Sequence, residues 1–228
     1  MSEIIIKTQA EFDALPEKFD EFTYIKINSS EKIIINRAWG NSSVVARGNS
    51  RVEAWGNCSV VAWGNSSIYS YSSDISVALY GFAVLFLIVK CVYKKISKYS
   101  IIQKVKNLGF FENNGIKKTK TIILYKKVSK DFKTQENTEN ETLWLINSTV
   151  IHKNWQPEKE ECGTGKFHAC SKPYFCDEFR NNEGDKYIAL SIKLSDLFEW
   201  KNNPQNPHKI GVRAAKVLYE VDKFGEKI

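Results

Sequence analysis

The residues best suited to chemistry gather in the short segment 161–177, which holds three of the five cysteines, one of the three histidines and two glycines. Gly163 and Gly165 allow a tight turn whose backbone amides stay exposed. Ser171 is a good N-cap for a helix with Pro173 in its first turn, and free amides at a helix start suit a phosphate or carboxylate. The segment therefore predicts a nucleotide- or anion-binding turn.

Zinc is one alternative for this segment, because Cys162, His168, Cys170 and Cys176 all carry ligand atoms that zinc prefers. The gaps between them are five, one and five residues. Structural zinc sites usually show paired Cys-x-x-Cys knuckles instead. The spacing disfavours zinc, and we expect no metal site.

A cysteine nucleophile with His152, His168 or His208 as its base is another alternative, although sequence does not show which of these groups are close. The simpler interpretation is that Cys170 and Cys176 are small buried apolar residues. The chain starts without a signal-peptide pattern, and an odd number of cysteines favours reduced thiols. We therefore expect a cytoplasmic protein.

The elements that position these residues begin with an octad, Ala-Trp-Gly-Asn-Ser-Ser-Val-Val, repeated with variations over residues 38–69. Because eight is even, side-chain alternation along extended strands keeps its phase between copies. A short fixed period predicts a β-solenoid. The expected inward row consists of small and β-branched residues: Val44, Ala46, Gly48, Ser50, Val52, Ala54, Gly56, Cys58, Val60, Ala62, Gly64, Ser66 and Ile68.

Trp39, Arg47, Trp55 and Trp63 share one outward slot in successive octads. With two octads per turn, Trp39 stacks over Trp55 and Arg47 over Trp63, whereas with three, Trp39 stacks over Trp63. Such a surface row can bind sugars, peptides or unstacked bases. A self-stabilising ladder needs no ligand and is the favoured interpretation.

Residues 77–89 form an unbroken apolar run of 13 residues, and a membrane-spanning helix needs about 20. We predict that the octad register slips by one near residues 72–74 and that the run forms the last solenoid turns. The alternative is a short membrane span over 75–93 with a positive flank from Lys90.

Charge is uneven along the chain, since residues 90–127 hold eleven lysines and one acid in a protein of net charge +7. The stretch from Lys90 to Lys127 could lie on nucleic acid or an anionic surface, although a solvated linker is the simpler interpretation. We therefore divide the chain into a solenoid with an N-terminal cap at 1–89, a lysine-rich connector at 90–120 and an α+β domain at 121–228.

Hydrophobic alternation outside the octads predicts a mainly β fold, a β-solenoid followed by a small α+β domain. Strands at 4–7 and 24–28 around a helix at 9–17 would cap the solenoid. In the second domain the expected strands are 122–128, 143–146, 166–170, 186–193 and 209–221.

Residues 121–228, with the motif CGTGKFHAC and the ending VLYEVDKFGEKI, resemble an uncharacterised domain that recurs in phage, prophage and gut-bacterial proteins, often behind octads of this type. The resemblance covers nearly the whole chain. It implies a phage-associated protein, located in the host cytoplasm, and it implies no particular activity.

The order Leu143-Trp144, then GTGKFHA, then a serine is similar to the motif order of poly(ADP-ribose) polymerase-like ADP-ribosyltransferases. This resemblance implies NAD as cofactor. Leu145 and Ile146 stand where that family has its ribose-binding histidine and a glycine, so either His168 compensates or the domain is not catalytic. The implied nucleotide-binding residues are Gly163, Gly165, Phe167, His168 and Ser171, and the implied catalytic acid is Glu220.

Three classes of function follow. We predict a non-catalytic interaction protein, in which the solenoid is a scaffold that displays a C-terminal binding domain to a protein partner. The first alternative is a nucleotide-binding, ADP-ribosyltransferase-like effector. The second is a membrane-anchored spacer protein.

Overall fold

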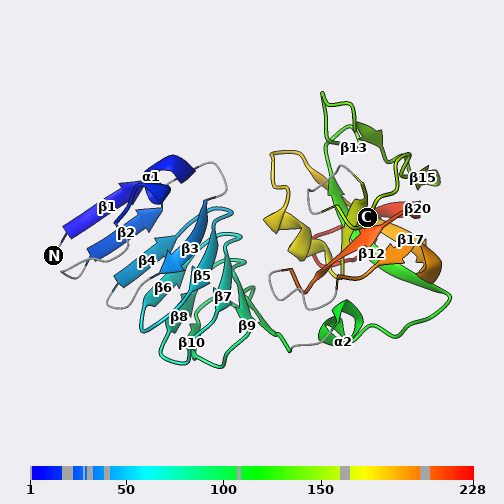
Figure 1. The fold of residues 1–228 in the computed structure, drawn as a ribbon. Helices are drawn as coiled ribbons and strands as arrows, with labels where there is room; N and C mark the ends of the chain where they lie inside the picture. The colour runs from blue at the N-terminus through cyan, green and yellow to red at the C-terminus, as the bar shows by residue number, and fades with distance from the viewer. Residues whose placement is uncertain are drawn as a thin grey trace. The chain divides into compact units, whose positions relative to one another are not determined.

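The computed structural model describes residues 2–16, 23–27, 29, 33–38, 42–106, 109–159, 165–200 and 206–228. The chain divides into two compact units, Met1–Lys106 and Asn107–Ile228. Both are mainly β, and the first is a β-solenoid of parallel strands (Figure 1), so the predicted fold class is confirmed.

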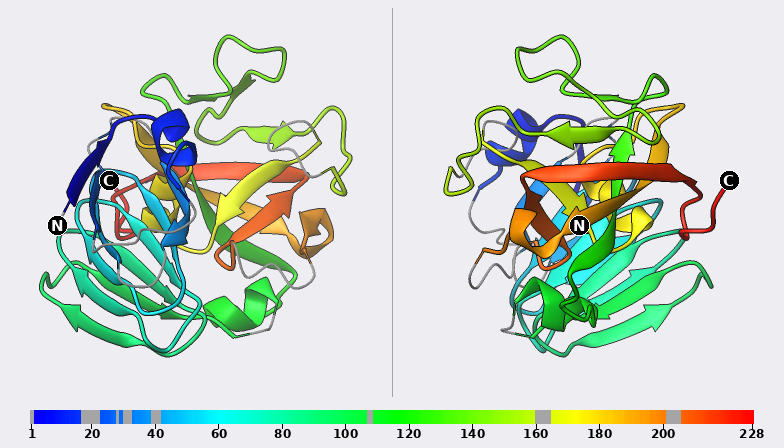
Figure 2. Two further views of the ribbon diagram at one scale, coloured as in Figure 1. Left: turned by 60° about the vertical axis from the view of Figure 1, so that its left-hand side comes forward. Right: turned by 90° about the vertical axis from the view of Figure 1, so that its right-hand side faces the viewer.

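The solenoid consists of two parallel sheets, and from β4 on the chain alternates between them. The first sheet contains β1 (Ser2–Ile6), β2 (Thr23–Ile27), β4 (Ser42–Ala46), β6 (Ser59–Ala62), β8 (Ser76–Leu79) and β10 (Val92–Lys95). The second contains β3 (Ile34–Ala38), β5 (Arg51–Ala54), β7 (Ser67–Ser70), β9 (Val84–Leu87) and β11 (Ile101–Lys104). Figure 2 shows these coils stacked side by side.

Two octads make one turn of the solenoid. Val44 pairs with Val60, sixteen residues further on, and Val52 pairs in the same way with Ile68. These side chains are fully buried and stack in rows that form the solenoid core. The rows repeat because each coil places the same kind of side chain directly on its neighbour.

The glycines are an exception to the predicted inward row. Gly48, Gly56 and Gly64 are exposed and lie in the turns, each with φ of +67°. This left-handed conformation is costly for a residue with a Cβ atom. The turns also stack closely, since a Cβ on Gly64 would lie 3.1 Å from the Gly48 carbonyl oxygen. The even octad period predicted the strands correctly, but the alternation stops at the turn.

The outward rings stack on one another at the spacing of the coils. Trp55 stacks on Tyr71 with ring centroids 4.3 Å apart, and Trp63 stacks on Tyr80 at 4.0 Å. The rings of both pairs are nearly parallel, with interplanar angles of 6° and 7°. The register of β4 and β6 places Arg47 beside Trp63 in the next coil. Trp39 lies outside the described residues.

The predicted register slip is confirmed, because Val60 pairs with Val77 at a spacing of seventeen residues. The apolar run 77–89 forms β8 and β9, and Val77, Leu79, Leu85 and Leu87 belong to the buried core. Within the described part of the chain, no helix has the length and apolar character needed to cross a membrane.

The solenoid continues beyond residue 89, so the predicted connector at 90–120 requires correction. Strands β10 and β11 pair with β8 and β9, and the first unit ends at Lys106. Their composition hid them, because Lys95 pairs with Leu79 and Lys104 with Leu87, at positions that are buried one coil earlier. A last coil has no following coil to cover it, and lysines at such positions blunt an open sheet edge.

At the N-terminal end, helix α1 (Gln9–Asp13) lies between β1 and β2 in sequence, as predicted, although it stops four residues earlier than expected. Thr8 and Glu11 form a reciprocal capping box at its start. Phe12 is buried in the solenoid core, so the helix caps the core at this end.

The second unit is built on a seven-stranded antiparallel sheet with the order β15-β20-β17-β12-β16-β19-β18. Its strands are β12 (Thr121–Val128), β15 (Thr149–Ile151), β16 (Phe167–Cys170), β17 (Lys186–Lys193), β18 (Leu197–Phe198), β19 (Lys209–Val212) and β20 (Ala214–Val221). A hairpin of β13 (Lys133–Thr134) and β14 (Thr142–Leu143), helix α2 (Phe110–Asn114) and the 3-10 helices η1 (Pro173–Glu178) and η2 (Leu194–Asp196) complete it.

Three expectations for this unit were wrong in detail. The predicted strand 143–146 is reduced to the end of β14, because the Trp144 ring is buried in the core. The predicted strand 209–221 is two strands, β19 and β20, which occupy different places in the sheet. Ser171 is not an N-cap, since η1 begins at Pro173 after Lys172 and is a short 3-10 helix.

Replacing both Lys95 and Lys104 with valine tests the role of the last coil. The change restores apolar residues at positions that are buried one coil earlier, so we expect association between open solenoid ends, seen as a larger mass in light scattering after size exclusion. The double variant Lys193→Val and Lys216→Val, at exposed sites in the other unit, is the matched control. A mass equal to that of the unchanged protein would contradict this role.

Candidate functional site

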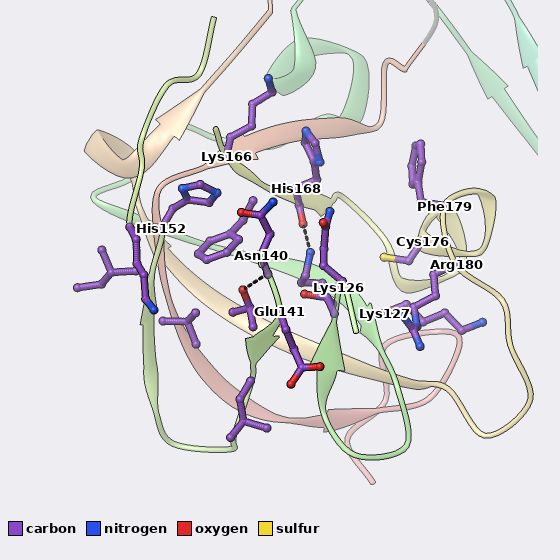
Figure 3. A pocket seen from close by; sticks show the side chains of 18 of the residues that line it. Lys126, Lys127, Asn140, Glu141, His152, Lys166, His168, Cys176, Phe179 and Arg180 are labelled. Carbon is purple, nitrogen blue, oxygen red and sulfur yellow. Dashed lines mark hydrogen bonds between the residues drawn. The ribbon is translucent and has the colours of Figure 1, made fainter. Parts of the chain in front are cut away.

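The main cavity of the second unit lies where β12 and β16 separate. These strands pair at Tyr125 and Cys170, and beyond that pair the Lys126 Nζ atom donates a hydrogen bond of 3.0 Å to the carbonyl oxygen of His168 (Figure 3). The cavity measures about 710 Å³. Its walls come from β12, the β13–β14 hairpin, β15, β16 and the segment that follows η1.

Lys126 is the central cation of this cavity. Its ammonium group also lies 4.9 Å from the centre of the Trp144 ring. The pKa of Lys126 is lowered to about 8, mainly by burial and also by the charges of Lys209 and Arg180, against the opposing effect of two cysteines. Within the described part of the chain, no carboxylate lies within ion-pair distance of Lys126.

Positive charge surrounds the neighbouring imidazole. The pKa of His168 is lowered to about 2, mainly by burial and also by repulsion from Lys209, Lys126 and Lys166. The ring lies beside Trp200, with centroids 5.6 Å apart. His168 is therefore neutral at physiological pH, and the three lysines give this end of the cavity a positive potential that attracts anions.

Two other cations of the cavity wall are already neutralised. The Lys127 ammonium donates at 2.6 Å to Asp177, and Asp177 also accepts a hydrogen bond of 2.6 Å from the Tyr187 hydroxyl. Arg180 makes a bidentate pair with Glu136, at 2.6 and 2.9 Å, and a third bond of 2.9 Å to Asp185. These pairs stabilise the wall and are poor candidates for ligand binding.

The outer part of the cavity carries exposed aliphatic side chains among polar ones. Leu143, Leu145 and Ile151 line it and are 47%, 50% and 61% exposed, and the exposed Glu139, Glu141 and Lys153 line it as well. Phe167 is half-buried between Trp144 and His152, with edge-to-face contacts at 4.8 and 4.7 Å. The cavity thus combines a cationic inner end with a mixed outer lining that includes three aliphatic side chains.

The structure brings only part of the predicted nucleotide site together. Phe167 and His168 line the cavity. The Ser171 hydroxyl is buried and donates to Asn114 Oδ1 at 2.6 Å. Glu220 lies on β20, outside the cavity lining, and forms an ion pair of 3.4 Å with Lys186. Ser171 therefore connects α2 to the sheet unit.

The predicted glycine turn is only partly described. Gly163 lies outside the described residues. Gly165 is buried, and its carbonyl oxygen accepts a hydrogen bond of 2.8 Å from the Gln156 amide. A Cβ at this position would lie 2.3 Å from the Gln156 carbonyl oxygen, so Gly165 permits a close approach of two backbone segments.

The thiols and histidines do not form a nucleophile pair that the geometry supports. Burial raises the pKa of Cys170 well above its usual value, which disfavours the reactive thiolate. His208 is buried and paired with Glu178 at 3.0 Å. Among the described residues, no group of three or more His, Cys, Asp or Glu side chains is able to hold a metal. Cys162 lies outside the described residues.

Sequence reasoning missed Lys126 and Lys209, although one signal was present. In strand 121–128, Ile122, Leu124 and Val128 alternate as buried residues, and Lys126 occupies the next place in that row. A lysine at a core position of a strand marks either a buried ion pair or a cavity.

Comparison of the chain with protein-family models, curated proteins and solved structures found no match. The arrangement of side chains therefore has to carry the functional argument by itself.

Replacing His168 with glutamine tests the electrostatics of the cavity. The folded-state pKa lies below that of an unfolded histidine, near 6.5, so as pH falls below 6.5 the unfolded chain takes up a proton that the folded chain does not. Between pH 7.5 and 5.5 we expect the unchanged protein to lose about 1 kcal/mol more unfolding free energy than His168→Gln. Urea unfolding at both pH values measures this, and equal losses would contradict it.

Proposed function

We propose that this protein is a non-catalytic binding protein, in which the β-solenoid is the scaffold and the C-terminal unit holds an anionic ligand in the cavity beside Lys126. The observation that carries the proposal is the Lys126 ammonium, which is directed to a carbonyl oxygen and a tryptophan ring and has no carboxylate within ion-pair distance in the described chain. A buried ammonium group without an anionic partner is costly, and a bound anion that pairs with it reduces this cost.

The contrast with the neighbouring cations supports this choice. Lys127 and Arg180 stand in the same wall, yet each has carboxylate partners of its own. If Lys126 had only a structural role, we would expect a carboxylate partner for it as well. The ligand can be a free anion or an anionic group on a protein partner, and a phage-associated, cytoplasmic role remains part of the proposal.

A nucleotide ligand such as NAD is the second candidate, favoured by the presence of Phe167 and His168 in the cavity lining. The engaged Ser171 and the distant Glu220 give this candidate no assembled transferase site. For the lysines from 90 to 127 we propose no single polyanion surface, because residues up to Lys106 belong to the solenoid and Lys127 is buried in the other unit.

Thermal unfolding in the presence of inorganic phosphate, ADP-ribose, NAD and zinc tests the proposal on the full-length protein. An anion that binds the folded state raises the melting temperature in a saturable way. We expect such a rise with phosphate or ADP-ribose and its loss in Lys126→Met, which keeps an unbranched side chain but removes the ammonium group. Lys193→Met, at an exposed site on β17, is the control and retains the rise.

Two results would decide against the proposal or reorder its candidates. If no anion shifts the melting temperature, or if Lys126→Met responds like the unchanged protein, the anion site does not exist. If NAD stabilises the protein far more than phosphate, and Phe167→Ala removes only the extra stabilisation, the nucleotide ligand becomes the first candidate.

A further inference from the structure

Three large aliphatic side chains line the cavity and remain exposed, beside exposed polar residues of the same lining. Leu143 ends β14, Leu145 follows two residues later, and Ile151 ends β15, so two segments of the chain contribute aliphatic surface to the cavity. Single exposed aliphatic residues are ordinary on protein surfaces, whereas several gathered at one opening mark a binding site.

The cationic and the aliphatic residues of the cavity differ in burial. At the inner end Lys209 is 8% exposed, and Lys126 contacts the His168 carbonyl group and the core residue Trp144. At the outer end Ile151 is 61% exposed. A ligand that fills the cavity therefore meets positive charge at the inner end, and at the outer end it has aliphatic surface available among polar groups.

We infer that the ligand is an amphipathic anion, with a carboxylate or phosphate head beside Lys126 and an aliphatic tail against Leu143, Leu145 and Ile151. The inference rests on the proposed anion-binding function and adds the chemistry of the rest of the ligand. A cavity of about 710 Å³ is within the usual range for small-molecule sites, so it accommodates a tail as well as a head.

The tail supplies binding free energy that a simple anion does not. Each methylene removed from water contributes about 0.8 kcal/mol, which is roughly a fourfold gain in affinity. The head determines orientation, because reversing its charge would place a cation beside Lys126, Lys166 and Lys209, the three lysines around His168. Affinity should therefore depend on both parts of the ligand.

Calorimetric titration of the full-length protein with four probes separates the two contributions. Acetate presents the head alone, decanol the tail alone, decanoate both, and decyltrimethylammonium the tail with the opposite charge, all below the concentrations at which they aggregate. We expect decanoate to bind at least tenfold more tightly than any of the other three. In the series hexanoate, octanoate and decanoate, affinity should rise about fifteenfold with each two methylenes that become fully buried.

Variants at exposed positions assign the tail without endangering the fold. Leu145→Ser and Ile151→Ser should weaken decanoate binding several-fold and leave acetate binding unchanged, while Lys126→Met should weaken both. Ile123→Ser is the matched control, because Ile123 is 43% exposed on the same strand as Lys126 and does not line the cavity. It should bind decanoate like the unchanged protein.

The outcomes separate this inference from the function on which it rests. If small anions bind and a longer chain adds no affinity, or if decyltrimethylammonium binds as well as decanoate, the amphipathic ligand is excluded while the anion site stands. If neither acetate, phosphate nor decanoate binds, both the inference and the proposed function fail.

Discussion

The separation of β12 and β16 is the constraint on which the cavity depends. The two strands pair at Tyr125 and Cys170, and beyond this position their backbone groups cannot satisfy one another. The Lys126 side chain reaches across and donates to the His168 carbonyl oxygen, in the place of a missing ladder bond. The same lysine therefore holds the gap between the strands and supplies the charge within it.

Burial explains why the cations near this gap behave differently. Removing an ammonium group from water is costly unless a carboxylate or several hydrogen bonds compensate it. Asp177 compensates Lys127, and Glu136 with Asp185 compensates Arg180. Lys126 has only a carbonyl oxygen and the face of Trp144, which stabilise a cation less well than a carboxylate does. Among the described residues Lys126 is thus a cation without a carboxylate partner, and it lines the cavity itself.

The solenoid was predictable from the sequence because the inward-facing residues recur at the same positions of each octad. Val44, Val52 and Val60 are buried as the even period requires, and the slip before Val77 follows from the same pattern. Local composition gave the wrong prediction at the turns between strands and at the last coil of the solenoid. Gly56 follows the alternation in sequence but lies in a turn, and Lys95 occupies a core position in a coil that nothing follows. Neither is visible without knowing where a strand stops or which coil is last.

The candidate site was predictable only where chain order equals spatial order. Phe167 and His168 are neighbours on one strand, and both line the cavity, although successive side chains of a strand point to opposite faces. Ser171 lies three residues later, yet Asn114 of helix α2, far away in sequence, engages its hydroxyl group. Lys209 reaches the cavity from β19, because β19 pairs with β16 through Cys170. These contacts depend on strand order in the sheet, which local periodicity does not encode.

Motif order and site geometry are therefore separate kinds of information in this domain. Residues that the sequence analysis assigned to a transferase-like motif have structural contacts where the structure describes them. The Trp144 indole N–H donates to Thr134 at 2.9 Å within the core, Gly165 admits the Gln156 backbone, and Glu220 pairs with Lys186. A residue whose polar atoms are already engaged can take part in ligand binding only if that contact breaks, and breaking a buried hydrogen bond costs about 1–3 kcal/mol. Among the residues that the structure describes, Lys126 has no carboxylate partner to release when an anion binds, although it lies outside the motif.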